Sequence, residues 1–141
     1  MSAINVRTAS WVDDRLMIEA LRYTVFVIEQ MIPAGLEVDQ HDAGSFHALA
    51  CTKEGRGIAT GRMLPDGRLG RIAVLREYRN QGVGQQMTHY LIEQAIATGL
   101  NEVYLHAQLH ALGYYQRLGF VAEGKPFQEA GIKHQLMRKV V

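Results

Sequence analysis

The spacing of apolar residues along the 141-residue chain predicts most of its strands. Side chains of a strand point alternately to its two faces, so short alternating or continuous apolar runs between turn residues are typical of strands. Such runs predict strands over residues 4–8, 45–52, 57–64, 68–74, 102–107, 120–123 and 134–140. Residues 53–56 and 65–67 have the composition of tight turns, so the second, third and fourth strands should form an antiparallel meander.

Three other segments repeat apolar residues every three or four positions, which predicts helices over residues 10–33, 83–99 and 111–118. The apolar face expected for the first helix consists of Leu16, Ala20, Leu21, Val25 and Ile28, and that expected for the helix over residues 83–99 consists of Val83, Met87, Leu91 and Ala95. The resulting order is β-α-β-β-β-α-β-α-β-β. It predicts one α/β (α+β) domain over residues 1–141, with a mixed, mostly antiparallel central sheet and helices on both faces.

Composition narrows the possible classes of function. The chain is 48% hydrophobic and 21% charged, as expected of a folded globule, and its formal net charge of +1 does not favour nucleic-acid or membrane partners. Its single cysteine, Cys51, excludes an internal disulfide and is expected to be a small buried residue. No signal peptide or membrane-spanning run is visible, so we expect a cytoplasmic protein. The six histidines show no metal-ligand spacing, and we expect no metal.

The segment between residues 71 and 84 is the most informative for function. A predicted strand and a short loop lead to Gly82 and Gly84 at the start of the longest predicted helix. Glycines allow the backbone to approach a ligand closely, and free N–H groups at a helix N-terminus attract phosphate oxygens. Arg76 and Arg79 add positive charge nearby. These features predict a site for a diphosphate-bearing cofactor, although a Gly-x-Gly alone also fits a simple tight turn.

Two other nucleotide-binding motifs are excluded by the neighbouring residues. A P-loop requires Lys-Ser or Lys-Thr after its second glycine, whereas Gln85 and Gln86 follow here. A dinucleotide fingerprint requires a third glycine where Met87 stands, and an acid near the end of the next strand, whereas Glu102 lies at its start. A nicotinamide-dependent oxidoreductase is therefore disfavoured.

Residues 79–84, Arg-Asn-Gln-Gly-Val-Gly, resemble the Arg/Gln-x-x-Gly-x-Gly/Ala signature of the GNAT acetyltransferase superfamily. Residues 111–120 resemble the second block of that superfamily, and segments at 21–30, 106–108 and 131–134 resemble its small bacterial ElaA/YjcF-like members. The resemblance implies a V-shaped splay between the strand ending at Val74 and the strand ending at Ala107. The pantetheine arm of acetyl-CoA is expected to enter this splay.

The resemblance also implies which residues bind acetyl-CoA. Main-chain groups of Ile72, Ala73 and Val74 would bond the pantetheine arm, and the Val74 N–H would serve as an oxyanion donor to the thioester carbonyl. The N–H groups expected to hold the pyrophosphate, beside Arg79, belong to Gln81, Gly82, Val83, Gly84 and Gln85.

Acetyl transfer to an amine requires a neutral nitrogen and benefits from an acid that protonates the departing thiolate. Tyr115 occupies the position of the family's general acid, which also contacts the cofactor. Gln108 replaces an asparagine of many members and is expected to bind cofactor or substrate, since an amide cannot take a proton at neutral pH. His106 and Glu29 are candidate bases. Water could instead carry the proton away, and His106 could equally be a structural residue that is hydrogen-bonded within the sheet.

The acceptor is expected to be a primary amine of a small molecule, attacked directly in a ternary complex by a monomer or homodimer. Glu29, Glu37 and His134 are candidates for binding it, although Glu37 and Asp39 also fit solvated loop acids. An amino-sugar phosphate such as glucosamine 6-phosphate is suggested by family analogy alone. The alternative function, which is not enzymatic, is that of an acyl-CoA-binding sensor module.

Overall fold

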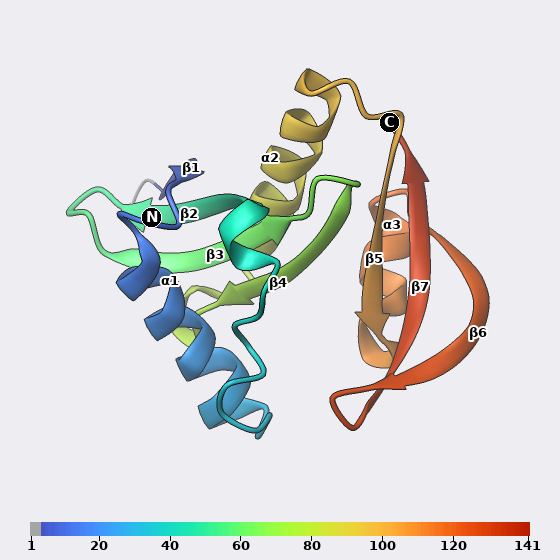
Figure 1. Ribbon diagram of the computed structural model, residues 1–141, viewed down its shortest axis with the longest axis horizontal. Helices are drawn as coiled ribbons and strands as arrows, with labels where there is room; N and C mark the ends of the chain where they lie inside the picture. Colours follow the sequence, from blue (N-terminus) through green and yellow to red (C-terminus); the bar gives the residue numbers. More distant parts are fainter. Residues whose placement is uncertain (1–3) are drawn as a thin grey trace.

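The computed structural model describes residues 4–141 as one seven-stranded sheet with helices on both faces (Figure 1). Its strands are β1 (Ile4–Ala9), β2 (Phe46–Thr52), β3 (Gly57–Met63), β4 (Arg68–Val74), β5 (Glu102–Gln108), β6 (Val121–Glu129) and β7 (Ile132–Val140). Its helices are α1 (Arg15–Arg22), α2 (Val83–Ala97) and α3 (Leu112–Arg117), with a π-helix η1 (Tyr23–Glu29). Three short 3-10 turns are η2 (Asp42–Gly44), η3 (Arg76–Tyr78) and η4 (Leu109–Ala111). The predicted fold class and order of the main elements are confirmed.

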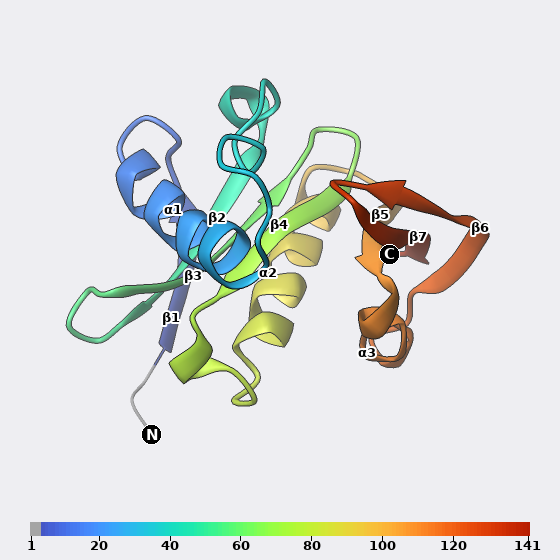
Figure 2. The ribbon, with the colours of Figure 1, turned by 90° about the horizontal axis from the view of Figure 1, so that it is seen from below.

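The strand order in the sheet is β1-β2-β3-β4-β5-β7-β6, antiparallel except between β4 and β5. Helices α1 and α2 cover opposite faces of the β2–β4 part of the sheet (Figure 2), and α3 packs against β5 and β6. The apolar positions predicted for α2 are buried, Val83 and Met87 among them, and Cys51 is buried in β2. No helix among residues 4–141 combines the length and apolar character needed to cross a bilayer.

The splay expected beside Val74 is present between β4 and β5. The two strands pair only through Arg68 with Tyr104 and Leu69 with Leu105, and then they part (Figure 1). Directly after the last pair, Arg71 has a φ of 50°, and the register between β3 and β4 shifts at Thr60 and Arg62. A bulge bends the strand that contains it. The bulge in β4 therefore explains why this strand leaves β5 and opens the sheet.

The prediction for the first helix is wrong in part. Its buried residues include Leu21 and Val25 as expected, but Leu16, Ala20 and Ile28 are exposed. The helix starts only at Arg15 and becomes a π-helix at Tyr23, in which the Gln30 N–H donates to the Val25 oxygen. A π-helix has more residues per turn than an α-helix, so a 3.6-residue period carried past Tyr23 wrongly assigns Ile28 to the buried side. In α1 itself the buried side consists of Ile18, Leu21 and Arg22, so Leu16 and Ala20 lie off the face that packs on the sheet.

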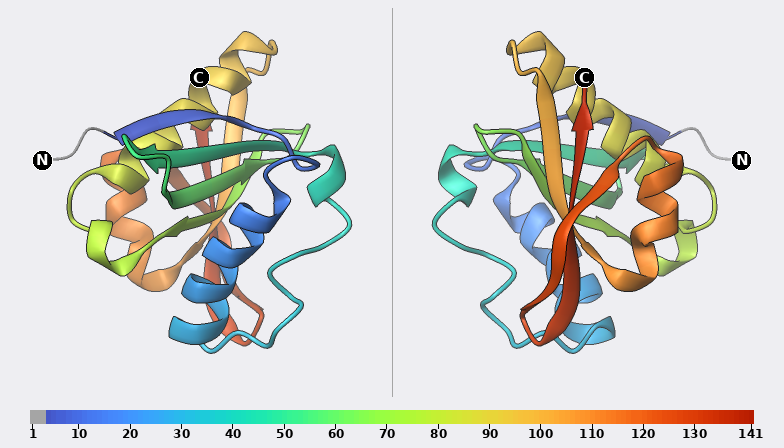
Figure 3. Two further views of the ribbon diagram at one scale, coloured as in Figure 1. Left: turned by 90° about the vertical axis from the view of Figure 1, so that its left-hand side faces the viewer. Right: turned by 90° about the vertical axis from the view of Figure 1, so that its right-hand side faces the viewer.

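The last two strands are longer than predicted and form a hairpin that turns at Ala130 and Gly131. Gly124 and Pro126 interrupt the strand pattern, and the pairing with β7 shifts between Glu123 and Phe127. Glycine and proline are tolerated here because β6 is an edge strand. The tip of this hairpin lies at the same end of the molecule as the end of η1 (Figure 3).

Candidate active site

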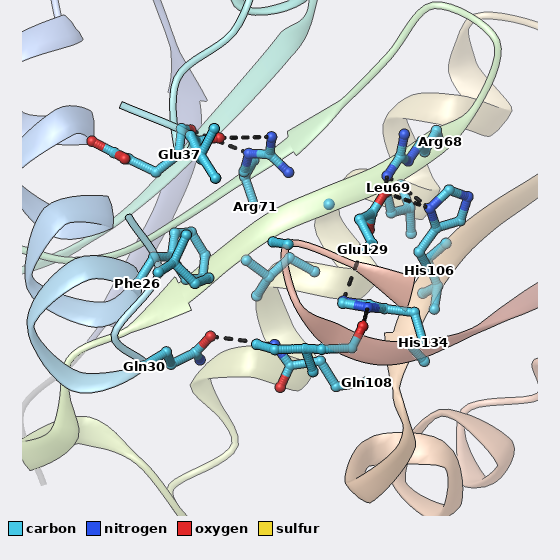
Figure 4. A pocket seen from close by; sticks show the side chains of 18 of the residues that line it. Phe26, Gln30, Glu37, Arg68, Leu69, Arg71, His106, Gln108, Glu129 and His134 are labelled. Atoms are coloured by element: carbon cyan, nitrogen blue, oxygen red, sulfur yellow. Dashed lines mark hydrogen bonds and ion pairs between the residues drawn. The ribbon is translucent and has the colours of Figure 1, made fainter. Parts of the chain in front are cut away.

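A cleft of about 560 Å³ lies where β4 and β5 part (Figure 4). Its floor is the bulged stretch 68–72 of β4 together with residues 105–108 of β5. One wall is the end of η1 and the loop 30–41, and the other is the tip of the β6–β7 hairpin with Tyr115 of α3. Four segments that are distant in sequence therefore surround one cavity.

The end of β4 presents main-chain groups to the gap beside β5. The Leu75 N–H donates to the Ile58 oxygen at 2.9 Å, while Val74 is paired with Ala59. In an antiparallel ladder this makes Val74 a non-hydrogen-bonded position, so its N–H and C=O point away from β3. By the same alternation, the main chain of Ala73 faces β3. The Val74 N–H thus faces away from β3, whereas the Ala73 main chain is directed toward β3 and is not available to the pantetheine arm.

The start of α2 has main-chain N–H groups left for a ligand. Gly82, at a φ of 80°, is the N-cap, and the first bond of the helix runs from the Gln86 N–H to the Gly82 oxygen. The N–H groups of residues 82–85 precede that bond and lack helical partners. A Cβ on Gly84 would lie 3.4 Å from the Tyr114 hydroxyl and 3.9 Å from a Val74 methyl. These are ordinary van der Waals distances, so the Tyr114 hydroxyl and Val74 bound the space beside Gly84 at the start of α2.

Arg79 connects this region to η1. Its Nε donates to the Val74 oxygen at 2.9 Å, and its guanidinium lies 2.8 Å from the Glu29 carboxylate. Arg76 lies 3.7 Å from the same carboxylate. Glu29 consequently faces Arg76 and Arg79 in the segment before α2 and does not line the cleft. Because Glu29 lies outside the cleft and is held by two arginines, the structure does not favour it as the base.

Tyr115 and Gln108 both line the cleft, as the sequence predicted. The Tyr115 hydroxyl has no hydrogen-bond partner among residues 4–141, and burial, with a smaller contribution from Tyr114, raises its pKa to about 12. A phenol with this pKa is protonated at neutral pH and can donate. The Gln108 amide donates to Gln30 at 3.2 Å and accepts from His110 at 2.7 Å, so it bridges β5 and the end of η1.

A cluster of ionisable side chains lies at the hairpin side of the cleft (Figure 4). The Glu129 Oε1 accepts from Arg68 at 3.2 Å and lies 3.1 Å from the His106 Nδ1, which is itself 2.9 Å from Arg68. His134 is nearly buried, and its Nε2 lies 3.8 Å from the Glu129 Oε2. The hydrogen bond from His106 outweighs burial and, with the charges of His106, Arg68 and His134, lowers the pKa of Glu129 to about 2. Glu129 is therefore ionised at neutral pH.

The sequence analysis did not identify Glu129. It stands 23 residues from His106 and 61 from Arg68, and no local motif relates the three. The available signal was its position two residues before Gly131, where the segment 131–134 that resembles the ElaA/YjcF-like proteins begins. The sequence analysis also gave no role to Tyr114, whose hydroxyl lies beside Gly84 at the start of α2.

Buried arginines hold the loop that forms the opposite wall. Arg22 and Arg62 both bind Asp42, and Arg62 also binds Asp39 at 2.7 Å. Arg71 binds Asp39 at 3.0 Å and the main-chain oxygen of Glu37 at 3.1 Å. Asp39 is thus an ion-pair partner and not a solvated loop acid.

Glu37 and Gln81, which the sequence predicted to bind the acceptor and the cofactor, each make a side-chain hydrogen bond to the main chain. The Glu37 carboxylate accepts from the Gly35 N–H at 2.9 Å, and Glu37 lines the cleft. The Gln81 side chain donates to the Glu77 oxygen at 3.1 Å in the loop before α2. Among residues 4–141 no group of three or more metal-ligating side chains is gathered in one place.

Comparisons with known proteins relate this chain to acyltransferases. A family model described as "Acetyltransferase (GNAT) domain" matches residues 13–141. An uncharacterized N-acetyltransferase of Bacillus subtilis, YjcF, is 36% identical over 123 residues, which cover 84% of this chain and 87% of that protein. An acyl-CoA N-acyltransferase structure from Pseudomonas aeruginosa is 30% identical with a TM-score of 0.88, covering 98% of this chain and all of that one. Escherichia coli ElaA is 26% identical with a TM-score of 0.85, covering 97% and 99%.

Proposed function

The chain belongs to the GNAT acetyltransferase family, and we propose that it transfers an acetyl group to the primary amine of a small molecule by direct attack in a ternary complex. Family membership makes it an acyltransferase of the ElaA/YjcF-like kind, with acetyl-CoA as its co-substrate. The observation that carries the proposal is that β4 contributes to two neighbouring features. Its stretch 68–72 lines the cleft, and beyond its end the chain leads to the start of α2, whose first N–H groups lack helical partners.

The donor half of the site follows from main-chain geometry. N–H groups of residues 82–85, with Arg79 and Gln81 beside them, would hold the pyrophosphate. The main chain of Ile72 would bond the pantetheine arm, and the Val74 N–H, which faces away from β3, would stabilise negative charge on the thioester oxygen. The Val74 oxygen is already bonded to Arg79. Bound acetyl-CoA supplies the acetyl group.

The acceptor half is the cleft itself. Tyr115, protonated at neutral pH, would give its proton to the departing sulfur. Gln108 would hold substrate or cofactor across the gap, and Glu37 and His134 line the space that an amine would fill. Arg71, one quarter exposed at the bulge, adds a cation that would suit an acceptor bearing an anionic group such as an amino-sugar phosphate.

The proposal is tested by thiol release from acetyl-CoA over a panel of amines, with calorimetric binding of acetyl-CoA measured in parallel. We expect release with at least one primary amine, and with amino-sugar phosphates above their unphosphorylated counterparts. Tight acetyl-CoA binding without release for any amine would instead support the non-catalytic sensor.

Removing the Tyr115 hydroxyl should slow turnover without weakening cofactor binding. We expect Tyr115→Phe to lower kcat by roughly 10- to 100-fold, the lower part of the usual range for an acid, because a thiolate is a fair leaving group unaided. The measurement is steady-state thiol release with saturating acetyl-CoA. Tyr90→Phe is the matched control, since the Tyr90 hydroxyl bonds Thr8 at 2.7 Å and does not line the cleft. Equal rates for both variants would contradict the acid role.

A further inference from the structure

We propose that His134 is the general base and that Glu129 binds the ammonium group of the acceptor, so that the two form an amine-binding pair in the cleft. This inference rests on the proposed amine acetylation and identifies the group that prepares the nucleophile. It assigns the base to a residue other than His106 and Glu29.

The protonation state of His134 follows from its main-chain contact. Its Nδ1 lies 2.7 Å from the Ile132 oxygen. A carbonyl oxygen only accepts hydrogen bonds, so Nδ1 must carry the proton. In the neutral imidazole the other nitrogen, Nε2, is then an acceptor with a free lone pair. His134 is 7% exposed and lines the cleft, so its ring is held in one orientation by packing.

The Glu129 carboxylate presents a second acceptor beside it. Its Oε1 is occupied by Arg68 and His106, whereas its Oε2 receives no hydrogen bond from the described part of the chain. Oε2 and the His134 Nε2 are 3.8 Å apart (Figure 4). Two acceptors at this separation have no proton to share. A nitrogen about 2.9 Å from each would close the triangle, and an ammonium supplies the two N–H donors required.

The surrounding groups maintain this arrangement. Arg68 from β4 and His106 from β5 hold one carboxylate oxygen, and the Phe127 ring lies edge-on to His106 and stacks near His134. The turn at Ala130 sets where the end of β6 lies relative to β7. Because Glu129 is ionised at neutral pH, it favours a cation in the adjoining space.

Residues of the cleft and the departing sulfur account for each proton and electron pair that moves in the reaction. The acceptor ammonium gives one proton to the His134 Nε2, and the imidazolium formed is stabilised by the Glu129 carboxylate and the Ile132 oxygen. The freed lone pair forms the C–N bond while the C–S bond breaks, and the sulfur leaves with its electron pair and takes the Tyr115 proton. The second proton of the nitrogen restores Tyr115, and His134 later releases its proton to solvent.

The kinetic test compares two variants with the best amine of the panel. His134→Gln should lower kcat roughly 100-fold or more with little change in the KM for acetyl-CoA, since a base contributes about 10²–10⁴. Glu129→Gln should raise the KM for the amine roughly 10-fold or more, with a smaller effect on kcat. Glu123→Gln and His89→Gln, exposed residues outside the cleft, should behave like the wild type.

A second measurement needs no turnover. The ¹⁵N chemical shifts of the His134 ring, at a pH where it is neutral, should show a protonated Nδ1 and a bare Nε2. The opposite tautomer, or wild-type rates in His134→Gln, or a kcat loss found in His106→Gln instead, would overturn the inference. An inactive wild type with every amine would overturn the proposed function, and these outcomes are distinguishable.

Discussion

Acetyl-CoA is expected to bind the Gly84→Asp variant roughly 30-fold more weakly than the wild type, a loss of about 2 kcal/mol. The new carboxylate would stand among the N–H groups proposed to hold the pyrophosphate, in a space bounded by the Tyr114 hydroxyl and Val74. An acid in the first turn of a helix interacts favourably with the helix dipole, so α2 should not be destabilised. Calorimetric titration, with thermal unfolding in parallel, separates the two effects.

Two comparisons sharpen this test. Gly44→Asp is the matched control, because Gly44 is an exposed glycine of η2 with open space around it and an ordinary φ. S-acetylpantetheine, which lacks the diphosphate, should lose much less affinity for the Gly84 variant than acetyl-CoA does. Unchanged acetyl-CoA affinity would show that the start of α2 does not bind the diphosphate.

The Asp42→Asn variant should lose about 3–5 kcal/mol of folding stability, a large share of the 5–15 kcal/mol typical of domains. Asp42 is 1% exposed and binds Arg22 and Arg62, whose side chains are 0% and 2% exposed. It also accepts from the Asp39 N–H at 3.0 Å. Without its charge, two buried guanidiniums lack their common partner. Chemical denaturation should report the loss, and thermal unfolding should move down by roughly 10 °C or more.

The same carboxylate sets a pH dependence. Burial raises the pKa of Asp42, but its hydrogen bonds and the charges of Arg22 and Arg62 outweigh burial and lower the pKa to about 2. A depressed pKa stabilises the fold above the unfolded value, and this stability is lost as pH falls from about 4 to about 2. Asp42→Asn should therefore flatten the acid loss of stability over that range. Glu77→Gln, which removes an exposed pair with Arg56, should change neither stability nor its pH dependence appreciably.

Strong local patterns were sufficient for much of the fold. The strand over residues 68–74 was predicted with its observed bounds, and the buried face of α2 was predicted from Val83 and Met87 onward. The first helix was predicted less well, because its change to a π-helix at Tyr23 and the burial of Arg22 depend on packing against the sheet. The length of β6 was underestimated since Pro126 is acceptable only on an edge strand.

In the candidate site, too, residues that belong to a local pattern were predicted and residues that depend on distant partners were not. Gly82 and Gly84 were recognisable because a left-handed N-cap and a close backbone approach are local demands that glycine meets. Glu129 and Asp42 were not, since neither belongs to a local pattern that relates it to its arginine and histidine partners. Glu29 was predicted as a candidate base and acceptor-binding residue, but its ion pair with Arg79 holds it outside the cleft.

The sequence by itself determined the order of the elements, the glycine-containing start of α2, and the family. These are properties of periodicity and backbone freedom, which act over a few residues. The tertiary structure alone decided where β4 leaves β5, which loop the buried arginines hold, and that Glu129 meets His106 and His134. Electrostatic partners are chosen by distance in space, and segments 20 to 60 residues apart acquire that distance only when the sheet assembles.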